Sequence, residues 1–283
     1  MTDNWLLQLR EHFDRAAEFF CGRETLAGVL ARQLLNCKVP DDPDVADHLI
    51  RLHRRKTRMD GSIGGSLILT ARAAWEMMEL GAPPDHAGVV RMSGYLLNQQ
   101  DAPGRWSEDG RAGNGFFSPG PRTERITSLA LPSGTVFVEE DDARFVASCL
   151  ALRSVLRAGH DRRAPVRAHL DGLLSIRAVD PHLAFVTIGA LGMAPPPFLD
   201  RVASLVAEVA DRQADDGSWP EVTVFHAVDM LMSVPTAPAR AAVRRAAPLI
   251  AGLQGESGAF DDSENEDIAL IAVRALHASR AGL

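Results

Sequence analysis

A short glycine-containing turn recurs along this chain, and its spacing is the strongest constraint on the fold. It occurs in four segments that lie between apolar stretches with helical spacing: MDGSIGGS (59–66), QQDAPGRWS (99–107), QADDGSWP (213–220) and QGESGAFDD (254–262). The shared glycines, at positions 61, 104, 217 and 258, are separated by intervals of 43, 113 and 41 residues. A regular period of this length predicts a repeat architecture, in which each helical pair buries its apolar face against its neighbours.

The long middle interval fits two repeats and an inserted segment. The insertion covers about residues 107–138 and is rich in Gly, Pro, Ser and Thr. The repeat that has lost its glycine turn would comprise helices around residues 166–174 and 181–191.

A further helical pair precedes the first glycine turn. Its first helix covers residues 5–20, and its second covers either 26–35 or 45–55. The chain then contains about six helical hairpins, which is enough to close a ring.

Strand signals are nearly missing from the sequence. The nearest candidate, residues 135–138, is too short to found a sheet. Proline-rich breaks fall between the repeats, where a proline ends one helix before the next begins. We therefore expect an all-α protein that forms one domain over residues 1–283.

Composition narrows the function classes. Acidic residues outnumber basic residues by 37 to 30, and the basic residues are scattered, which argues against a nucleic-acid partner. The three cysteines lack the spacing of a disulfide framework or a cysteine-rich zinc site. The N-terminus does not resemble a signal peptide, and no apolar run is long enough for a transmembrane span. We expect a cytoplasmic location.

The glycine turns resemble the QW motif of the squalene-hopene cyclase superfamily. In that motif an outer helix ends in Gln, passes a short turn and presents Gly-x-Trp. GYLLNQQDAPGRW (94–106) and VADRQADDGSW (209–219) match it, and GLQGESGAF (252–260) matches with Phe in place of Trp. The resemblance covers roughly residues 60–276 and implies an α/α barrel (toroid), the fold of terpenoid cyclases and protein prenyltransferases.

The motif also has a physical interpretation. Glutamine amides bond free groups at helix ends, glycine permits the tight turn, and the aromatic ring covers it. We therefore expect Trp106, Trp219 and Phe260 to pack over the turns, away from the central cavity.

An acidic cluster carries the catalytic part of the resemblance. Class II terpenoid cyclases protonate a double bond or epoxide with a DxDD motif at the start of an inner helix, and VFVEEDDARF (136–145) contains an ExDD version. The resemblance makes Asp141 the proton donor and Glu139 and Asp142 its partners. Adjacent carboxylates cannot all ionise, which holds one proton for delivery. Alternatively, these acids cap the helix and meet its dipole, as acids in any first turn do.

The expected substrate is a linear isoprenoid. Its cavity would be lined by aromatic and polar side chains from the inner helices: Trp75, Phe145, Phe185, Phe225, His226 and Asp229. With one Tyr, four Trp and eleven Phe in the chain, we expect one or two ring closures rather than a five-ring product.

Two alternatives remain at this point. VFHAVDMLMSV (224–234) faintly resembles the helix that supplies a zinc-binding histidine in protein prenyltransferases, with His226 as the ligand, but the matching Asp-x-Cys is not evident. The other alternative is a non-catalytic toroid that binds a lipid or protein partner. No resident metal or cofactor is expected, although a diphosphate on the substrate would allow Mg²⁺ to take part. The resemblance also allows peripheral contact with a membrane.

Overall fold

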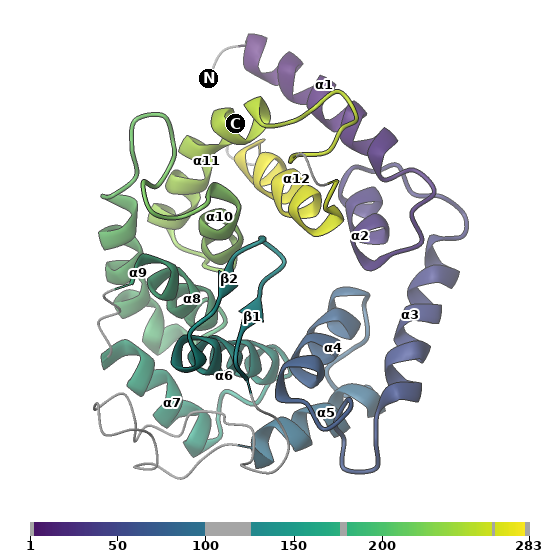
Figure 1. The fold of residues 1–283 in the computed structure, drawn as a ribbon, viewed down its shortest axis with the longest axis vertical. Coiled ribbons are helices and arrows are strands. Elements are labelled where there is room, and N and C mark those ends of the chain that lie inside the picture. Colours follow the sequence, from purple (N-terminus) through teal and green to yellow (C-terminus); the bar gives the residue numbers. More distant parts are fainter. Residues whose placement is uncertain (1–2, 100–125, 176–179, 262–263, 281–283) are drawn as a thin grey trace.

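A computed structural model describes residues 3–99, 126–175, 180–261 and 264–280, and it is all-α apart from one small hairpin (Figure 1). The helices within these ranges are α1 (Asp3–Phe19), α2 (Leu26–Leu34), α3 (Asp42–Lys56), α4 (Leu67–Glu79), α5 (Ala87–Asn98), α6 (Glu140–Arg157), α7 (Ala164–Ser175), α8 (Pro181–Leu191), α9 (Pro196–Ala210), α10 (Val224–Met232), α11 (Ala237–Gly252) and α12 (Glu266–Arg280). The prediction of an all-α protein is confirmed. Both candidates for the second helix form, as α2 and α3.

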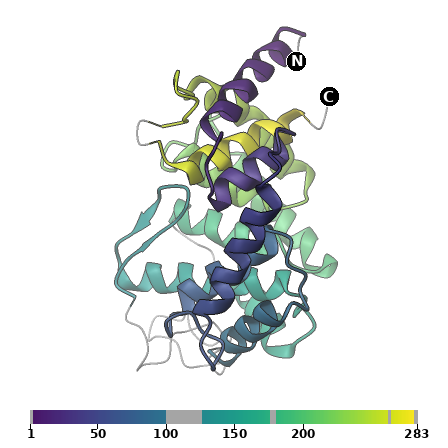
Figure 2. The ribbon, with the colours of Figure 1, turned by 90° about the vertical axis from the view of Figure 1, so that its right-hand side faces the viewer.

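The helices alternate between two positions in the molecule. Helices α4, α6, α8, α10, α12 and α2 contact one another in that order around the middle of Figure 1. Helices α3, α5, α9 and α11 lie outside them, and each packs against the inner helices that precede or follow it. The last helix, α12, contacts both α1 and α2, so the first and last helices lie together (Figure 2).

Three of the four recurring glycines lie in the described residues and have the backbone conformation that the turns require; Gly104 lies outside them. Gly61, Gly217 and Gly258 have φ between 86° and 91°, a region that side chains other than glycine rarely adopt. At Gly217 an added Cβ would lie 2.3 Å from the backbone oxygen of Arg245, and at Gly258 it would lie 2.3 Å from that of Arg15. Each turn therefore packs its glycine directly against the next outer helix.

The glutamines of the motif hold the same turns. The Nε2 of Gln213 donates to the backbone oxygens of Gly217 (2.9 Å) and Ala242 (3.0 Å). Gln254 makes the equivalent bond to Gly258 at 3.2 Å. The bonds to Gly217 and Gly258 satisfy carbonyl groups of the turns, and the bond to Ala242, which lies inside α11, joins the turn to that outer helix.

The aromatic residues of two turns are placed as predicted. Trp219 is buried against Phe185, with ring centroids 5.5 Å apart, and its Nε1 donates to the Val209 oxygen at 2.9 Å. Phe260 is fully buried, and neither ring lines the central cavity. The third predicted aromatic, Trp106, lies outside the described residues, as does most of the predicted insertion.

The described end of the insertion forms a β-hairpin. Strand β1 (Leu129–Ala130) pairs antiparallel with β2 (Val136–Phe137), and the hairpin crosses the inner helix ends in Figure 1. Its side chains alternate, so Leu129, Leu131 and Phe137 are buried while Val136 and Val138 are exposed. The hairpin thus covers the inner helices with one apolar face.

Most buried apolar residues of α1 to α12 belong to one continuous cluster. Of the helices in the described ranges, none combines the length and the apolar character needed to cross a membrane.

Candidate ligand-binding cavity

A cavity of about 340 Å³ lies between the inner helices and the hairpin. It is lined by one stripe from each of α4, α6 and α12, with helical spacing, and by residues of α2, α10 and the hairpin turn. The apolar part of its wall includes Leu26, Leu30, Leu131, Leu150, Met193, Met230, Met232, Leu270 and Ile271. The charged part comprises Arg72, Glu76, Glu79, Arg153, Arg157, Asp229, Asp267 and Arg274. The cavity is therefore amphipathic.

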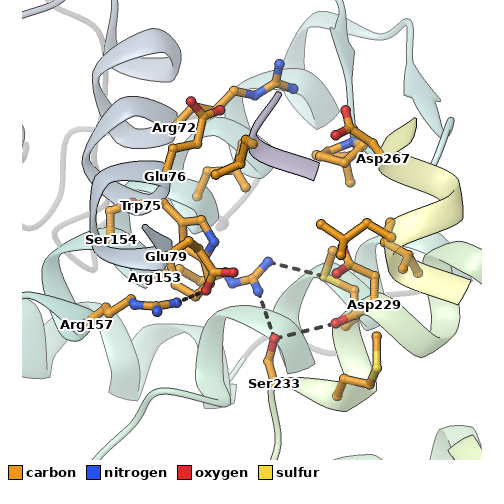
Figure 3. Close-up of a pocket in the computed structure, with 18 of the residues that line it drawn as sticks. Arg72, Trp75, Glu76, Glu79, Arg153, Ser154, Arg157, Asp229, Ser233 and Asp267 are labelled. Atoms are coloured by element: carbon orange, nitrogen blue, oxygen red, sulfur yellow. Dashed lines mark hydrogen bonds and ion pairs between the residues drawn. The ribbon is translucent and has the colours of Figure 1, made fainter. Parts of the chain in front are cut away.

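Trp75 is the aromatic residue of the wall, and two guanidinium groups cover its ring. The Cζ of Arg153 lies 4.7 Å from the ring centroid and the Cζ of Arg157 lies 4.4 Å from it. Both distances fit cation–π contacts. Figure 3 shows these side chains meeting between α4 and α6.

Glu79 pairs with two of the arginines. Its carboxylate forms ion pairs with Arg157 and with Arg274, which come from different inner helices. Burial by itself would raise the pKa of Glu79, but the two guanidinium groups hold it below its usual value. Glu79 is thus a charged link between α4, α6 and α12.

Arg153 has no carboxylate partner within the described parts of the chain. Its Nη2 donates to the Ser233 hydroxyl at 2.8 Å, and its Nη1 has the Met230 sulfur at 3.9 Å. Its Nε is buried and has no hydrogen-bond partner among the described residues. Burial lowers the pKa of Arg153 from its usual value, against the opposing charges of Asp229 and Glu79.

Asp229 faces the same cavity from α10 (Figure 3). It is half-buried, and its carboxylate makes no hydrogen bond or ion pair with any described residue. Burial raises its pKa above the usual aspartate value, against the opposing charges of Arg153 and Arg274. Asp229 is therefore the acid of the cavity wall that best combines an apolar setting with an unbonded carboxyl group.

The acidic cluster of the sequence lies elsewhere. Glu139 and Asp141 are exposed, Asp142 is half-buried, and none of the three lines the cavity. The expectation that Asp141 faces an apolar pocket is therefore wrong. The reason is helical phase: Asp141 precedes the cavity-lining Leu150 by nine positions on α6, and at about 100° per residue this places it roughly opposite the cavity.

Of the residues predicted to line the cavity, some do and others lie in the core. Trp75 and Asp229 line the cavity as expected. Phe145 is half-buried and packs against the core, while Phe185 and Phe225 are buried within it. These three phenylalanines do not reach the cavity.

His226 has a structural contact on each ring nitrogen. Its Nδ1 lies 3.3 Å from the Ser133 hydroxyl of the hairpin, and its Nε2 lies 3.1 Å from the backbone oxygen of His182. Phe137 also packs its edge against this histidine, at 6.3 Å between ring centroids. Burial lowers the pKa of His226 to about 4, so the ring is neutral at pH 7. His226 therefore anchors the hairpin.

Within the described residues, no three His, Cys, Asp or Glu side chains gather closely enough to hold a metal ion.

The charged residues beside Trp75 and Asp229 were missed by sequence reasoning. One signal was available for α6, because Leu150, Arg153, Ser154 and Arg157 follow the spacing of a single helix face. The pairing of Glu79 with Arg274 spans 195 residues and has no local signal.

Comparison of the sequence with family models and with curated proteins gave no match.

Proposed function

We propose that the helices close into an α/α toroid and that the central cavity binds a linear isoprenoid, which the protein cyclises by protonation. Support for the ring comes from α12, which contacts α1 and α2 as well as its neighbour α11. Support for the substrate class comes from the QW-type turns and from the apolar half of the cavity wall.

The acid in this proposal is Asp229 rather than Asp141. The single observation that carries it is the half-buried, unbonded carboxyl group in the cavity wall, whose pKa burial raises. A carboxyl group in this state retains a proton at higher pH than an ordinary aspartate does. It would transfer that proton to a carbon of the terminal double bond, and the resulting cation would be attacked by the next double bond to form a ring.

The reaction would be an isomerisation. The final cation loses one proton, so the product has the composition of the substrate and the acid is regenerated. The proposal needs no resident cofactor, because the protein itself supplies the proton. The cavity of about 340 Å³ is at the small end of ligand sites, so we expect one or two ring closures.

A second candidate is a toroid that binds the same kind of ligand without chemistry. The observation that favours it is the covering of Trp75 by Arg153 and Arg157. Cations in cyclisation reactions are stabilised by free aromatic faces. Here the described cavity wall has one aromatic ring, and guanidinium groups already lie over it.

Incubation of the purified protein with farnesyl, geranylgeranyl and squalene substrates distinguishes the two candidates. Gas chromatography with mass spectrometry of the extracts should reveal a cyclic isomer of one of the shorter substrates. Tight binding of such a substrate without any cyclic product would favour the second candidate. Neither binding nor product with any of the three would contradict both.

A further inference from the structure

We propose that Arg153 and Ser233 form a subsite that binds the anionic head group of a ligand in the central cavity. The head group would be a phosphate or a carboxylate. The inference rests on the proposed function in one respect, namely that the ligand occupies the central cavity. It adds the chemical class of the head group, which the resemblance leaves open.

The first argument is the charge of the cavity wall. Four arginines line it, and Glu79 forms ion pairs with Arg157 and Arg274. Glu76 lies 2.9 Å from His53 and is turned toward that partner. The other two acids of the wall, Asp229 and Asp267, have their pKa values raised by burial and so approach neutrality more readily than ordinary aspartates. Arg153 forms no ion pair with any of these acids in the described structure.

The second argument is the poor hydrogen bonding of Arg153. A guanidinium group has five donors, and a buried charge without partners is costly. In the described structure, Arg153 uses one donor on the Ser233 hydroxyl and directs another at a thioether sulfur, which is a weak acceptor. An oxyanion beside Nη1 would replace this weak contact with a charge-assisted hydrogen bond.

The third argument is that the site is held in place before a ligand arrives. The Trp75 ring lies against one face of the guanidinium group, and Ser233 fixes its Nη2. Figure 3 shows the Arg153 guanidinium between Trp75 and Asp229, at the centre of the charged part of the wall. The planar donor edge is therefore preorganised, which reduces the entropy lost on binding an anion.

The positions of Arg153 and Asp229 restrict the shape of a bound ligand. Because Arg153 and Asp229 face one small cavity, a ligand held by its head must fold back for its terminal double bond to approach Asp229. Such folding is the starting geometry for ring closure. The oxyanion would also disfavour ionisation of Asp229, which keeps the acid protonated.

The test compares ligands that differ only in the head group. Isothermal titration calorimetry would measure the dissociation constants of farnesyl monophosphate, farnesoic acid and farnesol for the wild-type protein, and inorganic phosphate would be tested as a competitor. We expect both anionic ligands to bind at least about tenfold more tightly than the alcohol, which corresponds to about 1.4 kcal/mol. Equal affinity for all three would overturn the inference.

Variants of the two residues test whether the preference for anionic ligands comes from the subsite. Arg153→Met should remove the preference for the anion while leaving the affinity for farnesol within about twofold, and Ser233→Ala should weaken anion binding to a smaller extent. Arg201→Met, at an exposed arginine outside the cavity, is the matched control and should change nothing. A preference that survives in Arg153→Met would contradict the subsite, and Ser233→Ala decides the matter if Arg153→Met fails to fold.

Binding and turnover can fail separately. Anion preference without any cyclic product would leave the subsite standing and favour the non-catalytic candidate. Cyclic product with no anion preference would leave the proposed function standing and overturn the subsite.

Discussion

The side-chain amide of Gln254 donates a hydrogen bond to the backbone oxygen of His12, 242 residues earlier, at 3.0 Å. Gln213 of the preceding glycine turn makes the same kind of bond, from its side-chain amide to the backbone oxygen of Ala242 in the next outer helix, α11. For the last repeat, the next outer helix is α1. The first helix thus takes the place of the neighbour that the last repeat would otherwise lack, which supports a closed ring.

Removing this bond should destabilise the whole fold. Gln254→Ala removes the amide bonds to the His12 and Gly258 oxygens and leaves the Gly258 carbonyl without its side-chain donor, so we expect a loss of about 1–3 kcal/mol in the free energy of unfolding, measured with urea. Glu256→Ala, at an exposed position of the same turn, should change stability by less than about 0.5 kcal/mol. Similar free energies of unfolding for the two variants would show that the contact between Gln254 and α1 contributes little to stability.

The glycine turns allow a test that separates backbone strain from close packing. Gly81 and Gly217 both have positive φ, 97° and 88°, but an added Cβ has free space at Gly81 and meets the Arg245 oxygen at Gly217. Gly81→Ala should cost about 1–2 kcal/mol for strain alone. Gly217→Ala should cost clearly more by thermal or urea unfolding. An equal loss of stability in the two variants would mean that α11 shifts freely to accommodate the methyl group at position 217.

The buried His226 should make stability depend on pH. Its pKa is about 4 in the folded protein and near 6.5 when unfolded, so the unfolded state binds more protons between these values. Stability should therefore fall as pH decreases from about 6.5 to 4, by about 3 kcal/mol from this group. His226→Gln should make that part of the profile shallower, with the slope from the buried His169 remaining, whereas His48→Gln, at an exposed position, should not change it. An unchanged slope in His226→Gln would contradict the assignment.

Sequence reasoning succeeded where the signal was local. The glycine turns, their glutamines and the aromatic residues at 219 and 260 were found because each turn is specified by a few adjacent residues. The repeat without a glycine turn was also found, as α7 and α8, from its apolar spacing alone.

The cavity could not be predicted in the same way. Asp141 was selected by its position in a motif, but the rotation of α6 turns it away and brings Arg153 and Arg157 inward. The Glu79 cluster joins three helices that are remote in sequence, and only the folded chain brings them together. Asp229 was placed correctly because it lies on an inner helix among apolar residues.

The most direct measurement of the central claim is the rate of cyclic product formation by wild type, Asp229→Asn and Asp141→Asn with the same isoprenoid. An amide keeps the shape of the carboxyl group but cannot deliver its proton, so Asp229→Asn should lower turnover by about 100-fold or more. Its melting temperature should stay close to that of the wild type, because the carboxylate makes no hydrogen bond with a described residue. Asp141→Asn should retain turnover within about twofold, since Asp141 is exposed and outside the cavity. The account would be contradicted by wild-type turnover in Asp229→Asn, or by its loss in Asp141→Asn.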